Sequence, residues 1–281
     1  MKGKEPPMPL AALPMYDWPE VRAETDALWR HMADHLNAAG FPAPDNLTRS
    51  ADLHGLWTSP DLLVAQTCGL PLVTTLRGQT VPLVTPHYAV PGCAGGTYSS
   101  AILVRADHPA ADIAELYGAC AAINGWDSQS GMAALRRTVA RHARDGRFFR
   151  TVVVTGSHRE SIRAVADGRA DCCAMDAVSY DLAQRFEAAA VAGTRLLGFS
   201  PAAPALPFIT SAARPNAEQH AMAEALLAAL RCVPKQLAEM LRIADASPAD
   251  TKAYEHLAEW AEADGRAGYA TLADGAAISD A

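Results

Sequence analysis

The chain has 281 residues, of which 50% are hydrophobic and 20% are charged, so it can bury a large core and is not a disordered protein. Its formal net charge is −7 and no basic block occurs, which argues against nucleic acid or an anionic membrane as a partner. No run of about 18 apolar residues is present, so the sequence predicts no membrane span.

The first ten residues, Met1 to Leu10, hold three prolines and an acid where an export signal would carry an apolar stretch. This start favours a cytoplasmic protein unless a signal has been removed. The segment from Trp18 to Ala39 predicts an amphipathic helix, because hydrophobic residues recur there at helical spacing. Those residues are Val21, Leu28, Met32 and Leu36.

The next segments predict short strands separated by polar loops. Pro60 to Gly69 predicts a short helix or strand that ends in a polar loop. Thr80 to Thr85 is apolar and β-branched, and we expect residues 86–88, which begin with proline, to end this strand. A loop from Gly92 to Ser100, rich in glycine and hydroxyl groups, precedes a predicted strand at 101–105.

A strand, a polar turn and a helix then follow one another twice. Ala119 to Ile123 predicts a strand and Met132 to Ala143 predicts a helix, with a hydroxyl-rich turn at 126–131 between them. Val152 to Val154 predicts the second strand, and a Gly-Ser-His turn leads into a helix from Arg159 to Asp167. Such a turn leaves the first helical N–H groups unpaired, next to the positive end of the helix dipole.

A third strand, within Gly168 to Asp176, ends on a carboxylate. Ligands of open α/β sheets bind outside the carboxyl ends of strands, so we predict an anion site where these three ends converge. Beyond it, residues 185–197 close this part of the chain and residues 205–211 form an extended strand. The segments 217–241 and 248–269 predict helices.

The segments Asp127 to Gly131, Thr155 to His158 and Gly168 to Asp176 together resemble the substrate-binding proteins of phosphate, phosphite and phosphonate ABC importers. The resemblance extends more weakly from about Asp61 to about Leu230. The family pattern is Ser-Thr-Ser-Gly, and this chain has Ser128-Gln129-Ser130-Gly131 in its place.

This resemblance implies an α/β, two-lobed type II periplasmic-binding-protein fold, in which each lobe is a mixed sheet flanked by helices and two strands form the hinge. The expected crossings put residues 1–104 together with 206–281 in lobe 1 and residues 105–205 in lobe 2. Segments 217–241 and 248–269 are then expected to rejoin the first lobe.

The strand ends supply the candidate ligand-binding residues. Ser128 and Ser130 would give hydroxyl donors beside the N–H groups of residues 129–132, and Gly131 would let the backbone approach the ligand. Gln129 places an amide where the family has threonine. Taken alone, the pattern favours a plain N-cap role for Ser128 or Ser130.

Ser157 and His158 begin the second helix. We expect its positive end to lower the pKa of His158 unless an anion arrives; the alternative is a capping histidine that faces solvent. Asp176 would repel a fully ionised phosphate. Either the ligand carries an amine or a protonated oxygen, or Asp176 only caps the segment that follows it.

The resemblance places Tyr98 and Ser99 at the ligand cleft, with Gln66 and Thr67 facing it from lobe 1. A tyrosine there would supply an apolar wall together with an O–H donor. The alternatives are plain flexibility for the glycine-rich loop at 92–100 and an ordinary turn in which Thr67 caps its own backbone.

The six cysteines form no CxxC pair, so we expect no structural zinc site and no other metal. Cys172 and Cys173 lie in a predicted strand and are expected to be buried. Cys68 and Cys93 each lie beside glycine in a loop, and could form a disulfide in an oxidising compartment.

The favoured hypothesis is a non-enzymatic, cofactor-free solute-binding protein that closes on a small oxyanion, such as a phosphonate or a phosphate ester, for ABC-type import. By resemblance it would work in the periplasm, as a monomer, with the membrane subunits of an importer. One alternative is a cytoplasmic ligand sensor. The other is an enzyme on the same scaffold, with Cys68 or Cys93 as nucleophile and His87 or His158 as base.

Overall fold

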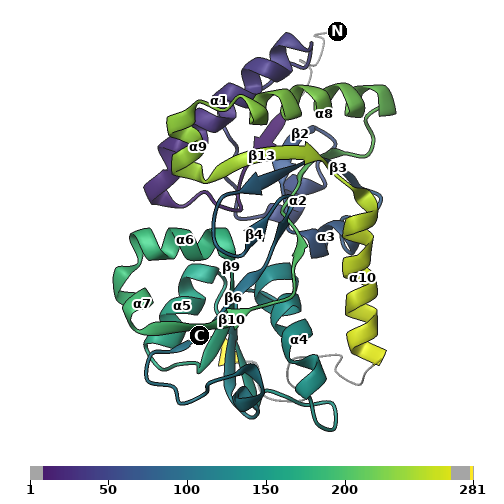
Figure 1. The fold of residues 1–281 in the computed structure, drawn as a ribbon. Helices are drawn as coiled ribbons and strands as arrows, with labels where there is room; N and C mark the ends of the chain where they lie inside the picture. The colour runs from purple at the N-terminus through teal and green to yellow at the C-terminus, as the bar shows by residue number, and fades with distance from the viewer. Residues whose placement is uncertain (1–8, 267–278, 281) are drawn as a thin grey trace. The chain divides into compact units, whose positions relative to one another are not determined.

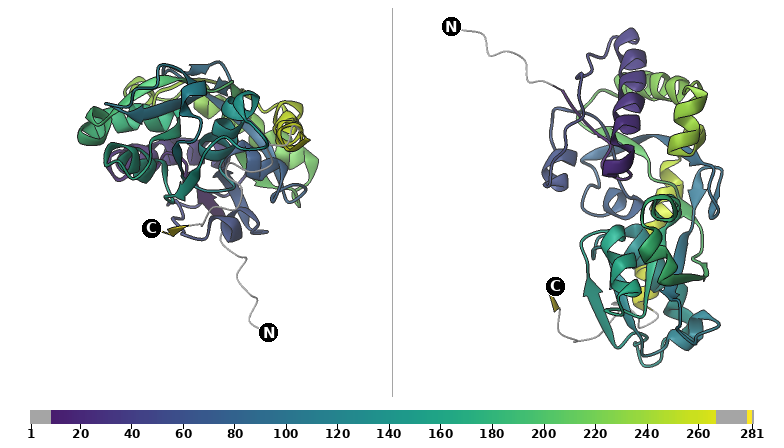
Figure 2. Two further views of the ribbon diagram at one scale, coloured as in Figure 1. Left: turned by 90° about the horizontal axis from the view of Figure 1, so that it is seen from below. Right: turned by 90° about the vertical axis from the view of Figure 1, so that its left-hand side faces the viewer.

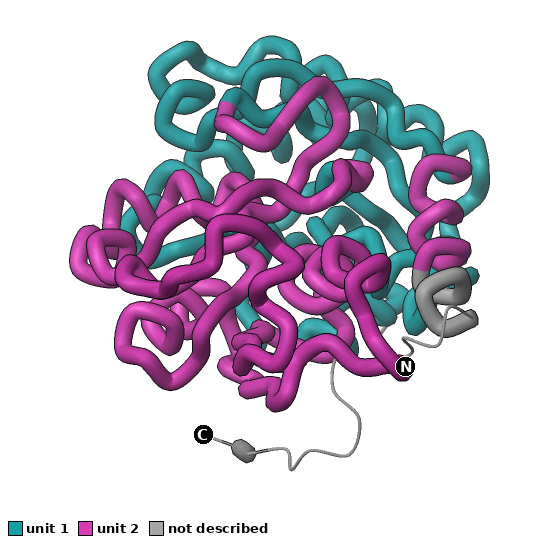
Figure 3. Tube along the Cα trace, turned by 60° about the horizontal axis from the view of Figure 1, so that its bottom comes forward, with its two compact units in different colours: residues 1–89, 205–251 teal, residues 90–204, 252–281 magenta. Residues whose placement is uncertain are grey.

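The computed structural model describes residues 9–266 and 279–280 of the chain. The chain divides into two compact units, which we call unit 1 (residues 1–89 and 205–251) and unit 2 (residues 90–204 and 252–281) (Figure 3). It therefore passes between the units three times, where two crossings were expected.

These crossings differ in position from the expected ones for two reasons. Strand β6 (Ser100–Arg105) pairs with unit 2 strands along its whole length, so the first crossing lies before it, at 89/90 instead of 104/105. Helix α10 (Thr251–Arg266) passes into unit 2 after its first residue, where Trp260 stacks on the guanidinium of Arg137, 5.2 Å from its ring centre.

Unit 1 is built on a five-stranded sheet in the order β1-β2-β12-β3-β13, in which only β1 and β2 are parallel neighbours (Figure 1). Its strands are β1 (Leu10–Ala12), β2 (Leu62–Gln66), β3 (Thr80–Tyr88), β12 (Phe208–Ser211) and β13 (Ile243–Pro248). The expectation that residues 86–88 end β3 is wrong. The sheet tolerates Pro82 and Pro86 because the pairing of β3 shifts register close to each of them.

Two helices of unit 1, α1 (Arg22–Ala38) and α8 (Asn216–Arg231), pack side by side, and α8 also covers β3 and β13 (Figures 1 and 2). Trp29, Met32 and Leu36 are fully buried on α1, at the spacing of one helix face, which confirms the first predicted helix. A 3₁₀ turn, η1 (Pro19–Val21), precedes it. The remaining helices are α2 (Leu53–Trp57), α3 (Gly69–Val73) and α9 (Lys235–Leu241).

Unit 2 is built on a six-stranded sheet in the order β10-β6-β9-β7-β8-β14. Strands β9, β7, β8 and β14 are parallel, whereas β6 is antiparallel to both of its neighbours, β9 and β10. Their bounds are β7 (Cys120–Ile123), β8 (Thr151–Val154), β9 (Cys172–Asp176), β10 (Thr194–Phe199) and β14 (Ser279–Asp280). Cys172 and Cys173 are fully buried in β9, as predicted, because helices cover this part of the sheet.

The helices of unit 2 follow the parallel strands, and a small second sheet in the order β11-β5-β4 precedes and follows them in sequence. The predicted helix at 132–143 begins earlier and is divided into π, α and 3₁₀ segments. The elements are η2 (Ile113–Leu116), η3 (Gln129–Ala133, the π-helix), α4 (Ala134–Val139), η4 (Ala140–His142), α5 (His158–Ala166), α6 (Ala177–Phe186), α7 (Ala188–Ala192), β4 (Cys93–Ala94), β5 (Thr97–Tyr98) and β11 (Ala203–Pro204). Within residues 9–266, each helix is too short or too polar to cross a membrane.

Candidate functional site

The carboxyl ends of β9, β7 and β8 lie at one edge of the unit 2 sheet, because these strands are parallel neighbours. Asp176 ends β9, Asn124 follows β7 and Thr155 follows β8. Strand β6 runs antiparallel to β9, so its first residue, Ser100, pairs with Asp176. Four polar residues from different parts of the chain therefore gather at this edge.

Ser128 and Asp176 cap the helices that begin here. The hydroxyl oxygen of Ser128 accepts a hydrogen bond from the N–H of Gly131 (2.9 Å), and its carbonyl accepts from Met132 and Ala133. These amides are thus used within the chain, and the expectation that they donate to an anion is wrong for Gly131 and Met132. Ser128 still has its own O–H to donate.

Gly131 makes room for the side chain of Asn124. A Cβ atom on Gly131 would lie 1.8 Å from Asn124 Oδ1 and 2.9 Å from its Cγ. The close approach that we predicted at this glycine is thus to a neighbouring side chain. Asn124 Oδ1 is buried and finds no hydrogen-bond partner among the described residues.

Several contacts fix the start of α5. Thr155 binds the carbonyl of Ile123 at the end of β7 through both its N–H (2.8 Å) and its hydroxyl (3.0 Å). Ser157 is the N-cap, with its hydroxyl accepting from Glu160 N (3.1 Å). Glu187 binds the guanidinium groups of Arg159 and Arg163 on the same helix. The position of the first α5 residue is therefore well determined.

That first residue, His158, contacts the preceding strand–helix turn. Its Nε2 lies 2.7 Å from Ser130 Oγ, so the two turns meet as predicted. Burial lowers the pKa of His158 to about 4, the direction expected, but through loss of solvent instead of the helix end. Its Nδ1 is buried and without a partner in the described part of the chain, so a solvent-facing cap is excluded.

Asp176 is a cap and a charge at once. Its Oδ1 accepts from the N–H groups of Val178 (2.8 Å) and Ser179 (3.1 Å), so Asp176 is the N-cap of α6. Burial, and then the negative charge of Asp176, raise the pKa of Cys93 to about 12. The Cys93 thiol is therefore protonated at neutral pH, which removes it as a nucleophile because thiolates are the reactive form.

The hairpin of β4 and β5 packs over the start of α6. Gly92, at φ +94°, permits this approach, since a Cβ there would lie 3.2 Å from the Cβ of Ala177, the first residue of α6, and 2.7 Å from the Phe199 ring of β10. Tyr98 in β5 is buried and pairs with Cys93 and with β11, and Ser99 donates its N–H to Gly92 (2.7 Å). Tyr98 and Ser99 thus lie within unit 2, on the segment that leads into Ser100.

Gln66 and Thr67 lie at the end of β2 in unit 1. The Gln66 amide donates to the Tyr88 hydroxyl (3.2 Å) and to the Leu206 carbonyl (3.1 Å), so its hydrogens are used inside the unit. Thr67 is fully buried, and its hydroxyl has no partner within residues 9–266. A threonine that caps its own backbone is therefore excluded.

Sequence reasoning missed two residues of the unit 2 edge, Asn124 and Ser100. The Ser100 hydroxyl, like Asn124 Oδ1, is buried without a partner in the described residues. Asn124 could have been found as the first polar residue after a predicted strand. Ser100 could not, because only the antiparallel pairing of β6 with β9 brings it beside Asp176. Trp126, in the turn that follows β7, is exposed.

The structure does not join Cys68 to Cys93 by a disulfide. All six cysteines fall in the described part of the chain, and each is a thiol. The Cys68 thiol is directed to the sulfur of Met15 within unit 1 (3.8 Å), whereas Cys93 belongs to the hairpin of unit 2.

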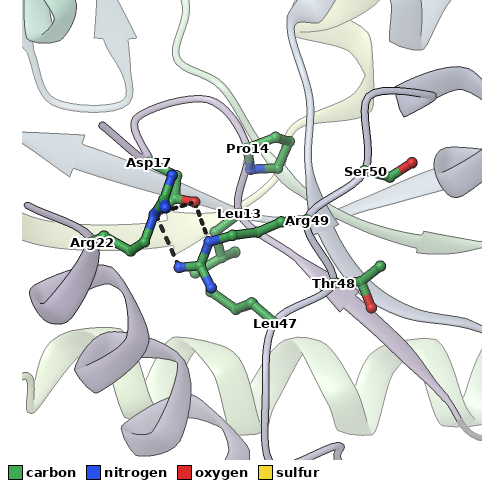
Figure 4. Close-up of a pocket in the computed structure, with 8 residues that line it drawn as sticks. All are labelled: Leu13, Pro14, Asp17, Arg22, Leu47, Thr48, Arg49 and Ser50. Carbon is green, nitrogen blue, oxygen red and sulfur yellow. Dashed lines mark hydrogen bonds and ion pairs between the residues drawn. The ribbon is translucent and has the colours of Figure 1, made fainter. Parts of the chain in front are cut away.

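A cavity of about 280 Å³ in unit 1 is lined by two arginines, but their charges are matched by acids (Figure 4). Arg49 binds both oxygens of Asp17 (2.6 and 3.1 Å) and also Asp26 (2.7 Å), and Arg22 lies 3.9 Å from Asp17. These pairs raise the pKa of Arg49. The cavity therefore offers little net positive charge to an anion, and we assign the cluster a structural role.

Two α/β units, each a sheet flanked by helices, form the architecture of the type II periplasmic-binding-protein fold. Residues 14–254 match the sequence model of a family described as "ABC transporter, phosphonate, periplasmic substrate-binding protein", and the chain belongs to this family. It is thus a substrate-binding protein for ABC import and not an enzyme, which confirms the resemblance found in the sequence.

Solved structures share the fold at low identity. PhnD1 from Prochlorococcus marinus in complex with methylphosphonate is 14% identical, with a TM-score of 0.71 over 93% of this chain and 100% of that one. A binding protein of an ABC phosphonate transporter from Pseudomonas aeruginosa is 13% identical (TM-score 0.69; 93% and 87% covered). XAC2383 from Xanthomonas citri bound to ATP is 15% identical (TM-score 0.68; 93% and 98% covered). No curated protein sequence matches the chain.

Proposed function

We propose that this chain captures a small oxyanion, a phosphonate, a phosphate ester or a related acid, for the membrane subunits of an ABC importer. The 2.7 Å contact between Ser130 Oγ and His158 Nε2 carries the proposal. If Ser130 donates in this contact, the N–H of His158 Nδ1 remains available to donate to a ligand. If His158 donates, the O–H of Ser130 remains available instead. Either arrangement keeps one polar hydrogen for an anion.

The protonation of His158 also suits an anionic ligand. Burial keeps the imidazole neutral, with its pKa lowered to about 4. A negative charge next to the ring raises this pKa, and a protonated imidazole donates from both nitrogens. Ligand binding is then accompanied by proton uptake, which makes the binding heat depend on the ionisation enthalpy of the buffer.

The acceptors at the same edge narrow the ligand class. The Asp176 carboxylate and the buried Asn124 Oδ1 repel a fully ionised phosphate, but they stabilise a protonated ligand oxygen or an amine. Gln129, also buried, adds an amide where the family has threonine. We therefore place aminoalkylphosphonates and monoprotonated phosphonates above inorganic phosphate.

Isothermal titration calorimetry of the full chain, freed of co-purified ligand, tests this proposal. The panel is methylphosphonate, aminoethylphosphonate, phosphite, phosphate, a phosphate monoester, ATP and methanesulfonate; ATP is included because XAC2383 was solved bound to it. We expect the strongest binding from a phosphonate. Binding by none of the phosphorus acids overturns the proposal. A preference for the sulfonate overturns a phosphorus acid as the ligand class, and a preference for ATP overturns the small size proposed for the ligand.

A pair of histidine variants connects the ligand to the site. We expect His158→Gln to weaken phosphonate binding about 10- to 100-fold, since a hydrogen bond to a charged group contributes about 1.5–3 kcal/mol. His256→Gln is the matched control, because His256 is exposed on α10 in the same unit. Equal affinities of the two variants contradict the role of His158.

We further propose that the crossings at 89/90 and 204/205 act as the hinge on which the units close over the ligand, in a monomer. Small-angle X-ray scattering with and without saturating ligand measures both properties. We expect the mass of one chain and a smaller radius of gyration in the bound state. An unchanged scattering curve contradicts closure.

A further inference from the structure

Three side chains that bind transition metals converge between α1 and α8 in unit 1. His31 and His35 lie one helical turn apart on α1, and Cys232 is the C-cap residue of α8, which packs beside α1 (Figures 1 and 2). The Sγ atom of Cys232 is 3.5 Å from His35 Nε2 and 3.7 Å from His31 Nε2. All three ligand atoms lie within 4.8 Å of one another.

The two sulfur–nitrogen separations match those of a tetrahedral metal site. With zinc bonds of about 2.3 Å to sulfur and about 2.0–2.1 Å to nitrogen, the tetrahedral angle sets sulfur and nitrogen about 3.6 Å apart. The observed 3.5 and 3.7 Å bracket this value.

The local electrostatics also favour a cation. Cys232 ends α8, where the helix dipole is negative, and the Ala229 carbonyl of the last turn points at the cluster. This carbonyl lies 2.9 Å from His31 Nε2 and 3.6 Å from Cys232 Sγ, so it accepts hydrogens from these groups. A metal ion would replace those hydrogens, and its binding would release the thiol proton.

We propose that His31, His35 and Cys232 form a binding site for Zn²⁺ or a transition-metal dication with the same ligand preference. Three protein ligands leave the fourth position for water, which reaches the site because Cys232 is exposed. A C-cap network alone accounts for the Ala229 contacts but not for the convergence of both imidazoles on one sulfur. All three residues of this site belong to unit 1. None of them is among the residues proposed for the oxyanion.

Metal titration of the reduced, chelator-treated full chain tests the site. We expect calorimetry with Zn²⁺ to give one ion per chain and thermal unfolding to shift upward with added Zn²⁺. Co²⁺ should show the thiolate-to-cobalt charge-transfer band and the intense visible bands of four-coordinate cobalt. A pale six-coordinate spectrum without charge transfer overturns the proposal.

Variants separate this site from adventitious surface binding. We expect Cys232→Ser and His35→Ala each to weaken Zn²⁺ binding more than about tenfold, and Cys232→Ser to remove the charge-transfer band, which needs the thiolate. The controls are Cys120→Ser and His54→Ala, which should bind as the wild type does. Equal affinity for Zn²⁺ in Cys232→Ser and wild type overturns the site.

A chemical readout on the unmodified chain covers the case of a variant that fails to fold. Bound Zn²⁺ should slow iodoacetamide alkylation of Cys232, measured by mass spectrometry, and leave the rate at Cys120 unchanged. The same rate at Cys232 with and without Zn²⁺ also overturns the proposal.

Discussion

The end of β2 in unit 1 and the strand edge of unit 2 differ in how many polar groups remain for a ligand. At the end of β2, Gln66 spends both of its hydrogens on Tyr88 and Leu206, and a single buried hydroxyl, that of Thr67, has no partner in the described chain. At the unit 2 edge, Asn124, Ser100 and His158 each present such an atom. Most of the binding free energy is therefore expected from unit 2.

The comparison also separates two kinds of residue within unit 2. Ser128, Ser157 and Asp176 cap the helices that follow them, so they fix the positions of those helices. Ser130 and His158 come from different helices and meet each other. Residues that look alike in sequence thus divide into those that build the edge and those that converge on it.

The largest expected effect concerns pH. His158 has a folded-state pKa of about 4, below the unfolded value near 6.5, so the folded state binds fewer protons in this range. Its contribution to stability is complete above about pH 6.5 and is lost as pH falls toward 4, by up to about 3 kcal/mol. Denaturant unfolding of the ligand-free chain between pH 7 and 4 measures this loss.

Because carboxylates also titrate in this range, the variant His158→Gln provides the reference. The wild type should lose more stability than the variant as pH falls. Above about pH 7 the stability of both proteins should have the same pH dependence. Parallel pH profiles would show that His158 is not buried in its neutral form.

The second effect is on packing at the unit 2 edge. Gly131→Ala should lower the free energy of unfolding by about 1–3 kcal/mol, because the new Cβ meets Asn124 Oδ1 at 1.8 Å. The control is Gly198→Ala in β10, where no atom lies within 4 Å of the added Cβ and we expect a change within about 0.5 kcal/mol.

The double variant Gly131→Ala with Asn124→Ala identifies the atom responsible. It should recover part of the stability lost in Gly131→Ala, because the overlapping side chain is gone. Strict additivity of the two substitutions would place the strain elsewhere.

The third effect separates a cap from a ligand contact. Ser157→Ala should lower stability by about 1 kcal/mol and leave phosphonate affinity nearly unchanged, whereas Ser130→Ala should weaken binding about tenfold. Urea unfolding and calorimetry on both variants measure the contrast. A loss of affinity in Ser157→Ala would assign its hydroxyl to the ligand as well.

The smallest effect is expected in unit 1. Thr67→Val removes a buried hydroxyl that has no partner among the described residues, so stability should stay the same or rise slightly. If the Thr67 hydroxyl contacts the ligand, Thr67→Val should weaken ligand binding by a factor of several. Calorimetry with the phosphonate preferred by the wild type measures it, and an effect larger than that of Ser130→Ala would reverse the ranking of the two units.

The hydrophobic pattern was sufficient for most elements of unit 2, because alternation of buried strands with capped helices is a local property. It predicted β7, β8 and β9, and the meeting of the two turns that carry Ser130 and His158. It failed at β3, where register shifts accommodate two prolines, and at the π-helix, which begins at Gln129, three residues before the predicted start of the helix.

The sequence by itself determined the family. Three short segments were enough, because each follows a strand and its residue types are largely set by local geometry. Only the tertiary structure decided which polar groups are spent inside the protein and which remain, because that depends on partners distant in sequence. Ser100 reaches Asp176 through the pairing of β6 with β9, and Cys232 lies 197 residues from His35 along the chain yet 3.5 Å away in space. Such contacts arise from the packing of strands and helices, which no local pattern records.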